Sequence, residues 1–74
     1  MHLANAEMGQ TYVVTHITGD SRFLSRITSI GLTEGCRLHI LQNRRKRPLL
    51  VHARDSMLAL DRGDCENVEV EAQS

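Results

Sequence analysis

The stretch Ser21–Leu41, which reads SRFLSRITSIGLTEGCRLHIL, is the strongest indication of the fold in this chain. Its first half predicts a short amphipathic helix, because apolar side chains recur at helical spacing. Asp20 or Ser21 can cap the helix, since a short side-chain oxygen accepts from the free N–H groups of the first turn. Gly31 stands where a helix ends in a left-handed residue. We expect the apolar face to pack against the rest of the protein, and it consists of Phe23, Leu24, Ile27 and Ile30.

Beyond this helix the chain reads as strands joined by turns. Thr33-Glu34-Gly35 predicts a turn, and the alternation of apolar and polar residues after it predicts a strand. Residues 1–10 give only a weak signal, residues 61–67 predict a turn or a single helical turn, and residues 71–74 are expected to fray. The predicted strands are 11–18, 36–43, 49–53, 57–60 and 68–70.

Five short strands at this spacing predict a mainly β fold in a single domain, residues 1–74. A small, closed or nearly closed five-stranded β-barrel is favoured, because closure removes the sheet edges that invite aggregation. The one short helix lies between the first and second strands, where its apolar face would plug one end of the barrel. Because the core is this small, weak self-association through an exposed strand remains an alternative.

The composition argues against several classes of function. Nine basic and nine acidic residues give a net charge of zero, so no global charge attracts the chain to nucleic acid or to an anionic membrane. No apolar run approaches the ~20 residues that a membrane span needs, and the first residues lack the pattern of a signal peptide. The chain is therefore predicted to be cytoplasmic, without insertion into a membrane.

No catalytic motif stands out, because a glycine-rich phosphate loop, GxSxG and HExxH are all lacking. We therefore expect no enzymatic activity. The metal-ligand candidates are His39 and His52, which lie on the outer faces of different predicted strands and can meet only if those strands are neighbours in register. No ligand pair has the close spacing of a zinc site, so no cofactor is expected to be required, and Fe²⁺ or Zn²⁺ would bind weakly. Cys36 and Cys65 are expected to stay free thiols, because cytosolic proteins rarely keep disulfides.

Four adjacent cations, Arg44-Arg45-Lys46-Arg47, predict an exposed loop. Such a loop either binds an anionic partner or simply keeps a turn soluble. Tyr12 and Phe23 are the only aromatic residues, whereas barrels that bind single-stranded nucleic acid use aromatic platforms. The shortage favours an acidic protein surface over nucleic acid as the partner.

Several short motifs stand in an order typical of one protein family. They are Ser29-Ile30-Gly31-Leu32 at the helix end, Thr33-Glu34-Gly35 in the next turn, Pro48-Leu49-Leu50-Val51, Met57-Leu58-Ala59-Leu60-Asp61-Arg62, and Val68-Glu69-Val70. In this order the chain resembles FeoA, the small cytosolic component of bacterial ferrous iron transport. The family usually has proline where this chain has Glu34, so the turn is expected to be less rigid.

The resemblance implies a small SH3-like barrel, similar to the modules that end the metal-dependent DtxR-type repressors. It also implies a non-enzymatic accessory protein that binds the cytosolic GTPase-like domain of the FeoB membrane permease and supports ferrous iron uptake. The alternative is a metal-binding or metal-sensing module with His and Cys ligands, and a nucleic-acid-binding barrel is a third hypothesis. The expected partner contacts are the polar face of the helix and the basic loop, that is Arg22, Ser25, Arg26, Ser29, Arg44, Arg45, Lys46 and Arg47.

Overall fold

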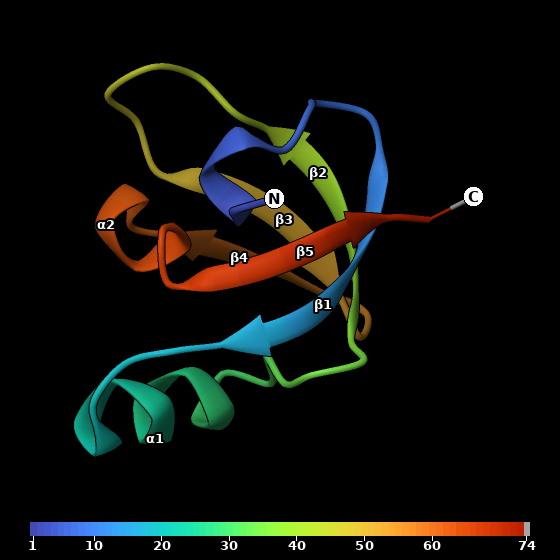
Figure 1. Ribbon diagram of the computed structural model, residues 1–74. Helices are drawn as coiled ribbons and strands as arrows, with labels where there is room; N and C mark the ends of the chain where they lie inside the picture. The colour runs from blue at the N-terminus through green and yellow to red at the C-terminus, as the bar shows by residue number, and fades with distance from the viewer. Residues whose placement is uncertain (74) are drawn as a thin grey trace.

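Five antiparallel strands form a single sheet in the order β4-β3-β2-β1-β5 (Figure 1). The structure is a computed structural model and describes residues 1–73. The predicted strands are all present within one or two residues, and the helix follows the first strand in the chain as predicted. The elements are η1 (Leu3–Asn5, a 3-10 helix), β1 (Thr11–Ile17), α1 (Ser21–Ser29), β2 (Arg37–Gln42), β3 (Leu49–Ala53), β4 (Ser56–Leu60), α2 (Arg62–Cys65) and β5 (Val68–Ala72).

Short connections between neighbouring strands fix the register of the sheet. The β3–β4 hairpin has a two-residue loop, because Ala53 pairs with Ser56. Its loop residues Arg54 and Asp55 both adopt positive φ, 52° and 65°, the conformation that matches the twist of a tight hairpin.

Within residues 1–73, no helix is long and apolar enough to cross a membrane.

The sheet stays open, so the predicted closed barrel is not confirmed. β4 and β5 are the two edge strands, and they do not pair with each other. The N-terminal segment lies along the outer edge of β5 instead: the amide of Val70 donates to the carbonyl of Met1 over 2.8 Å, and His2 forms an isolated bridge with Glu69. The beginning of the chain thus covers the edge that β4 would have to reach for closure.

The N-terminal segment also contributes to the core, which the sequence did not indicate. Leu3 is fully buried and Ala6 is nearly so. The side-chain amide of Asn43 donates to the carbonyls of Ala4 and Ala6, at 3.3 and 2.6 Å, and holds the segment against the sheet. At the other end, the strand continues to Ala72, so residues 71 and 72 are paired rather than frayed. Residue 74 of the predicted frayed end lies outside the described residues.

The helix α1 begins at the predicted cap and ends at the predicted glycine. The carboxylate of Asp20, and not the hydroxyl of Ser21, accepts from the amide of Phe23 over 2.8 Å. Gly31 has a φ of +93°, a left-handed conformation that glycine adopts without strain. The local signals in the sequence therefore set both ends of the helix.

The packing of α1 differs from the prediction. Phe23 and Ile27 are buried, but Leu24 and Ile30 are 37% and 40% exposed. The helix lies at one end of the sheet (Figure 1), and its buried residues are Phe23 and Ile27. The left-handed turn that follows α1 directs Leu32 into the core, where it is fully buried. Leu32 thus takes the place that the helical pattern assigned to Ile30.

Candidate functional site: two basic surfaces and a histidine pair

The polar face of α1 is exposed, as the partner prediction requires. Arg22, Ser25, Arg26 and Ser29 all lie at the surface. The hydroxyl of Ser29 donates to the carbonyl of Ser25 over 2.9 Å, so this hydroxyl already has a hydrogen-bond acceptor within the helix. The guanidinium of Arg26 lies 5.4 Å from the centre of the Phe23 ring, a cation–π contact. We call these four residues the helix surface.

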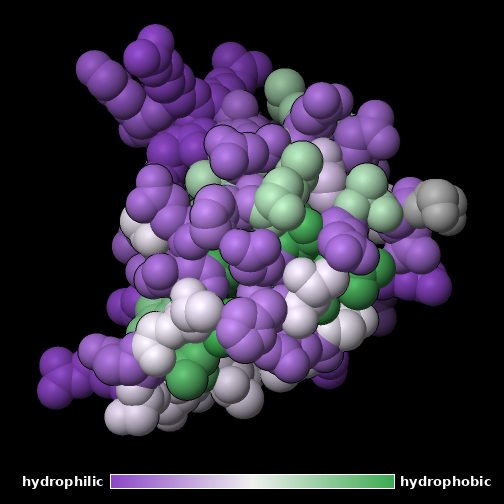
Figure 2. Space-filling model, viewed as in Figure 1, coloured by the Kyte–Doolittle hydropathy of each residue, from purple (hydrophilic) through white to green (hydrophobic). Residues whose placement is uncertain are grey.

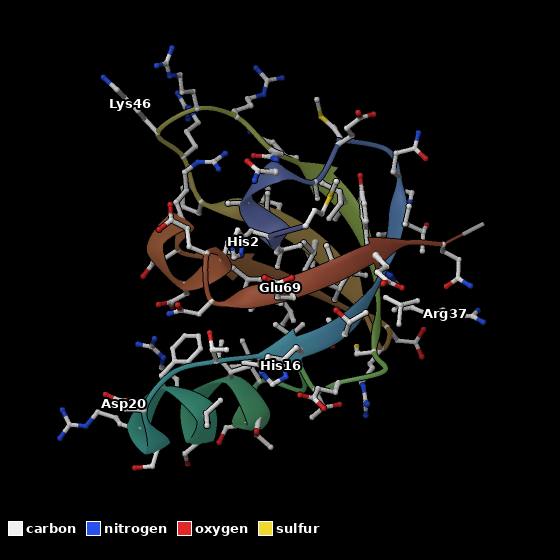
Figure 3. All side chains as sticks on the ribbon, viewed as in Figure 1. His2, His16, Asp20, Arg37, Lys46 and Glu69 are labelled. Atoms are coloured by element: carbon white, nitrogen blue, oxygen red, sulfur yellow. The ribbon has the colours of Figure 1, made fainter. Side chains whose placement is uncertain are left out.

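The basic loop between β2 and β3 carries four exposed cations: Arg44, Arg45, Lys46 and Arg47. The amide of Arg47 donates to the carbonyl of Arg44 over 3.2 Å and closes a tight turn, in which Lys46 has a φ of 62°. None of the four forms an ion pair with another residue between 1 and 73. Lys46 projects from the tip of the loop into solvent (Figure 3).

The two basic surfaces lie at opposite ends of the molecule, so the structure does not bring the predicted contacts together. Figure 1 shows the β2–β3 loop at the top and α1 at the bottom. In Figure 2 hydrophilic side chains protrude at both of these ends. Each surface is therefore a separate candidate for partner binding.

The short helix α2 connects these two surfaces, a role that the sequence did not indicate. Arg62 at its start donates to the carbonyl of Arg44 over 2.6 Å and to the side-chain oxygen of Asn43. Asp64, on the same helix, accepts from Arg26 over 2.9 Å. α2 thus anchors the base of the basic loop and also pairs with Arg26 of the helix surface.

The two histidines predicted as metal candidates lie directly opposite each other. His39 on β2 is the register partner of His52 on β3, and both side chains are exposed. The condition set by the sequence, neighbouring strands in matching register, is therefore met. No group of three or more His, Cys, Asp or Glu residues within 1–73 could hold a metal ion, so this pair would use two protein nitrogens.

Both cysteines are free and buried, in agreement with the expectation of free thiols. Burial is the main cause that raises the pKa of the Cys65 thiol to about 11, the nearby Asp64 and Asp61 raise it further, and Arg62 opposes the shift. A thiol that stays protonated at neutral pH is a poor nucleophile and a poor metal ligand. Cys65 therefore serves as a packing residue.

A hollow lies beside the free edge of β4. Its volume is about 210 Å³, and it is lined by apolar residues of α1 and β4 and by three charged residues: Ile27, Ile30, Ala59, Leu60, Arg26, Asp61 and Asp64. β4 has no charged residue, and its Met57 is 66% exposed. An uncharged edge strand can pair with another chain. The predicted weak self-association would therefore occur through β4.

Comparison with known proteins gives a match over nearly the whole chain. The family model described as the FeoA domain matches residues 1–72. A solved structure described as iron uptake regulatory protein FeoA superposes with a TM-score of 0.93 and 22% identity, over 99% of this chain and 97% of that chain. No curated protein sequence matches significantly.

Two other solved structures share the fold. The FeoA of Stenotrophomonas maltophilia, described as complexed with zinc and as a prokaryotic SH3 domain protein, has a TM-score of 0.81 and 20% identity, over 96% of this chain and 89% of that chain. A manganese-dependent transcriptional repressor has a TM-score of 0.90 and 23% identity, over 99% of this chain and 41% of that chain. At these identities the structures establish the fold alone.

Proposed function

The chain belongs to the FeoA domain family, and from that premise we propose that it is a non-enzymatic, cytoplasmic accessory protein of ferrous iron transport that binds and regulates the cytosolic GTPase-like domain of a FeoB-like permease. Family membership supports the role in ferrous iron transport. The permease as partner, the regulation and the contact surfaces are the proposal. We also propose that the arrangement of the strands is SH3-like, with an open sheet in place of a closed barrel.

The exposed charge of the basic loop is the main evidence for the proposal. Four cations on one short turn, none of them neutralised within residues 1–73, form a local positive field on a chain whose net charge is zero. Such a field attracts an acidic surface and raises the association rate. Because Arg62 holds the carbonyl of Arg44, the turn is ordered before a partner arrives, which lowers the entropic cost of binding.

The positions of the aromatic residues favour a protein partner over a nucleic acid. Tyr12 and Phe23 are 3% and 9% exposed, so neither offers a ring on which a base could stack. Nonspecific binding of single strands depends on such stacking as well as on charge. We expect no shift of an oligonucleotide in a mobility assay at moderate salt.

The helix surface is a second contact in this proposal, and it acts apart from the loop. A partner that touches both ends of the molecule must span the distance between them, on a molecule whose principal-axis extents are 30, 27 and 23 Å. A partner that touches one end contacts either the loop or α1. The two surfaces can therefore be tested separately.

Chemical-shift mapping during a titration with the permease's cytosolic domain tests the proposal. Shifts that cluster at residues 44–47, alone or together with shifts on α1, would support it. Replacement of Arg44, Arg45, Lys46 and Arg47 by serine should abolish the loop shifts and weaken binding. Binding that is unchanged in this variant would remove the loop from the interface, and the absence of any shift at low salt would reject the proposal.

A further inference from the structure

A row of four register partners crosses the exposed face of the sheet. Thr11 on β1 pairs with His39 on β2, His39 pairs with His52 on β3, and His52 pairs with Met57 on β4. The side chains of directly opposite residues leave the sheet on the same face, with Cβ atoms roughly 4.5–5.5 Å apart. Two imidazoles at that separation can point their nitrogens at one ion between them.

These two histidines differ from the other two in their surroundings. His2 lies 3.4 Å from a carboxylate oxygen of Glu69, and His16 lies 3.1 Å from one of Glu34. His39 and His52 have no carboxylate partner among residues 1–73. The sheet therefore places two imidazoles against each other, and no acidic group competes for their nitrogens.

A hydrogen bond orients one of the two rings. The hydroxyl of Thr11 lies 3.1 Å from Nδ1 of His39. When Nδ1 carries the proton and donates it to this hydroxyl, Nε2 keeps its lone pair free for an ion. Histidine ligands in metal sites are oriented in this way by a hydrogen bond from their second nitrogen.

We propose that His39 and His52 form a two-imidazole binding site for a divalent transition-metal cation on the exposed face of the sheet. Imidazole suits nickel, copper, zinc and iron, whereas magnesium prefers oxygen ligands. The remaining coordination positions are filled by water. Fe²⁺ lies below Ni²⁺ in the order of complex stability, so it binds more weakly at the same two nitrogens. The site does not depend on the contact with the permease.

Titration with Ni²⁺ tests the site, with Mg²⁺ as the control ion. Because Ni²⁺ is paramagnetic, its binding should broaden the amide resonances around residues 39 and 52 first. His39→Gln and His52→Gln should each weaken Ni²⁺ binding at least about tenfold, since loss of a group that merely orients a ligand already costs about 10–100-fold in affinity. Thr11→Val should weaken it by a smaller factor, because it removes only the orienting hydrogen bond.

His2→Gln and His16→Gln are the matched controls, since both side chains are exposed histidines outside the row. Neither should change the affinity for Ni²⁺. The side chains of all four histidines lie at the surface, and circular dichroism checks that each variant is folded. The proposal is overturned if His39→Gln and His52→Gln leave the affinity unchanged, if a control variant lowers it equally, or if Mg²⁺ binds as well as Ni²⁺.

Discussion

Arg26 on α1 donates to the carboxylate of Asp64 on α2 over 2.9 Å, and this contact joins two residues that lie 38 positions apart in the sequence. The side chain of Arg26 is 59% exposed, so the pair contributes at most about 1 kcal/mol to stability. If the proposed function holds, the pair would matter more for binding, because Asp64 pairs with an arginine that would otherwise be available to an acidic partner.

Asp64→Asn should therefore strengthen binding of the permease's cytosolic domain at low salt while it changes the free energy of unfolding by less than about 1 kcal/mol. Calorimetric titration and urea denaturation measure the two quantities. Asp55→Asn, at an exposed position in the β3–β4 hairpin, removes the same charge without touching Arg26. An equal gain in affinity from both variants would show that net charge alone is responsible.

The cap of α1 should contribute measurably to stability. Asp20→Ala removes the carboxylate that accepts from the amide of Phe23 and should lower the free energy of unfolding by about 1 kcal/mol. Asp20→Asn keeps an acceptor oxygen and should retain most of that stability. If the two variants unfold at the same urea concentration, the cap is not the source of the effect.

Gly19 is expected to be intolerant of any side chain. Its φ is +138°, and a Cβ at this position would lie 2.6 Å from Cδ2 of Phe23. Gly19→Ala should destabilise the protein by about 1–3 kcal/mol through backbone strain and displacement of the ring. Gly63→Ala is the matched control, because a Cβ there meets nothing within 4 Å. A denaturation midpoint that falls equally in both variants would contradict this explanation.

The buried thiol of Cys65 should make stability depend on pH in alkaline solution. Its pKa is raised from the ordinary 9.0 to about 11, mainly by burial. Between these values the unfolded chain loses the thiol proton while the folded protein keeps it, so the free energy of unfolding should fall as the pH rises from 9 to 11. Cys65→Ala should show a smaller fall over this range. Parallel curves for the two proteins would refute the role of the thiol.

Local signals in the sequence predicted the elements well, because each depends on nearby residues. The alternation after Gly35 predicted β2, and the cap at Asp20 and the stop at Gly31 predicted α1. Burial of the helix was predicted less well. Whether Ile30 or Leu32 enters the core depends on how α1 meets the sheet, and helical periodicity carries no information on that contact.

The arrangement of the candidate sites depended on strand pairing, which the sequence could not provide. The pairing of His39 with His52 follows from the β2–β3 register, so only the condition under which they meet could be predicted from the sequence. The separation of the helix surface from the basic loop follows from the topology of the whole sheet. The covered edge of β5 depends on Leu3 and Ala6, whose burial no periodic pattern marked.

Whether the basic loop binds an acidic partner is tested by titrating the permease's cytosolic domain at increasing salt concentration. Arg45→Ser removes one exposed charge from the basic loop, and Arg37→Ser removes one from β2, away from both basic surfaces. We predict that the native protein binds at low salt, that affinity falls as salt rises, and that Arg45→Ser weakens binding while Arg37→Ser does not. No binding at low salt, or equal losses in the two variants, would contradict this prediction.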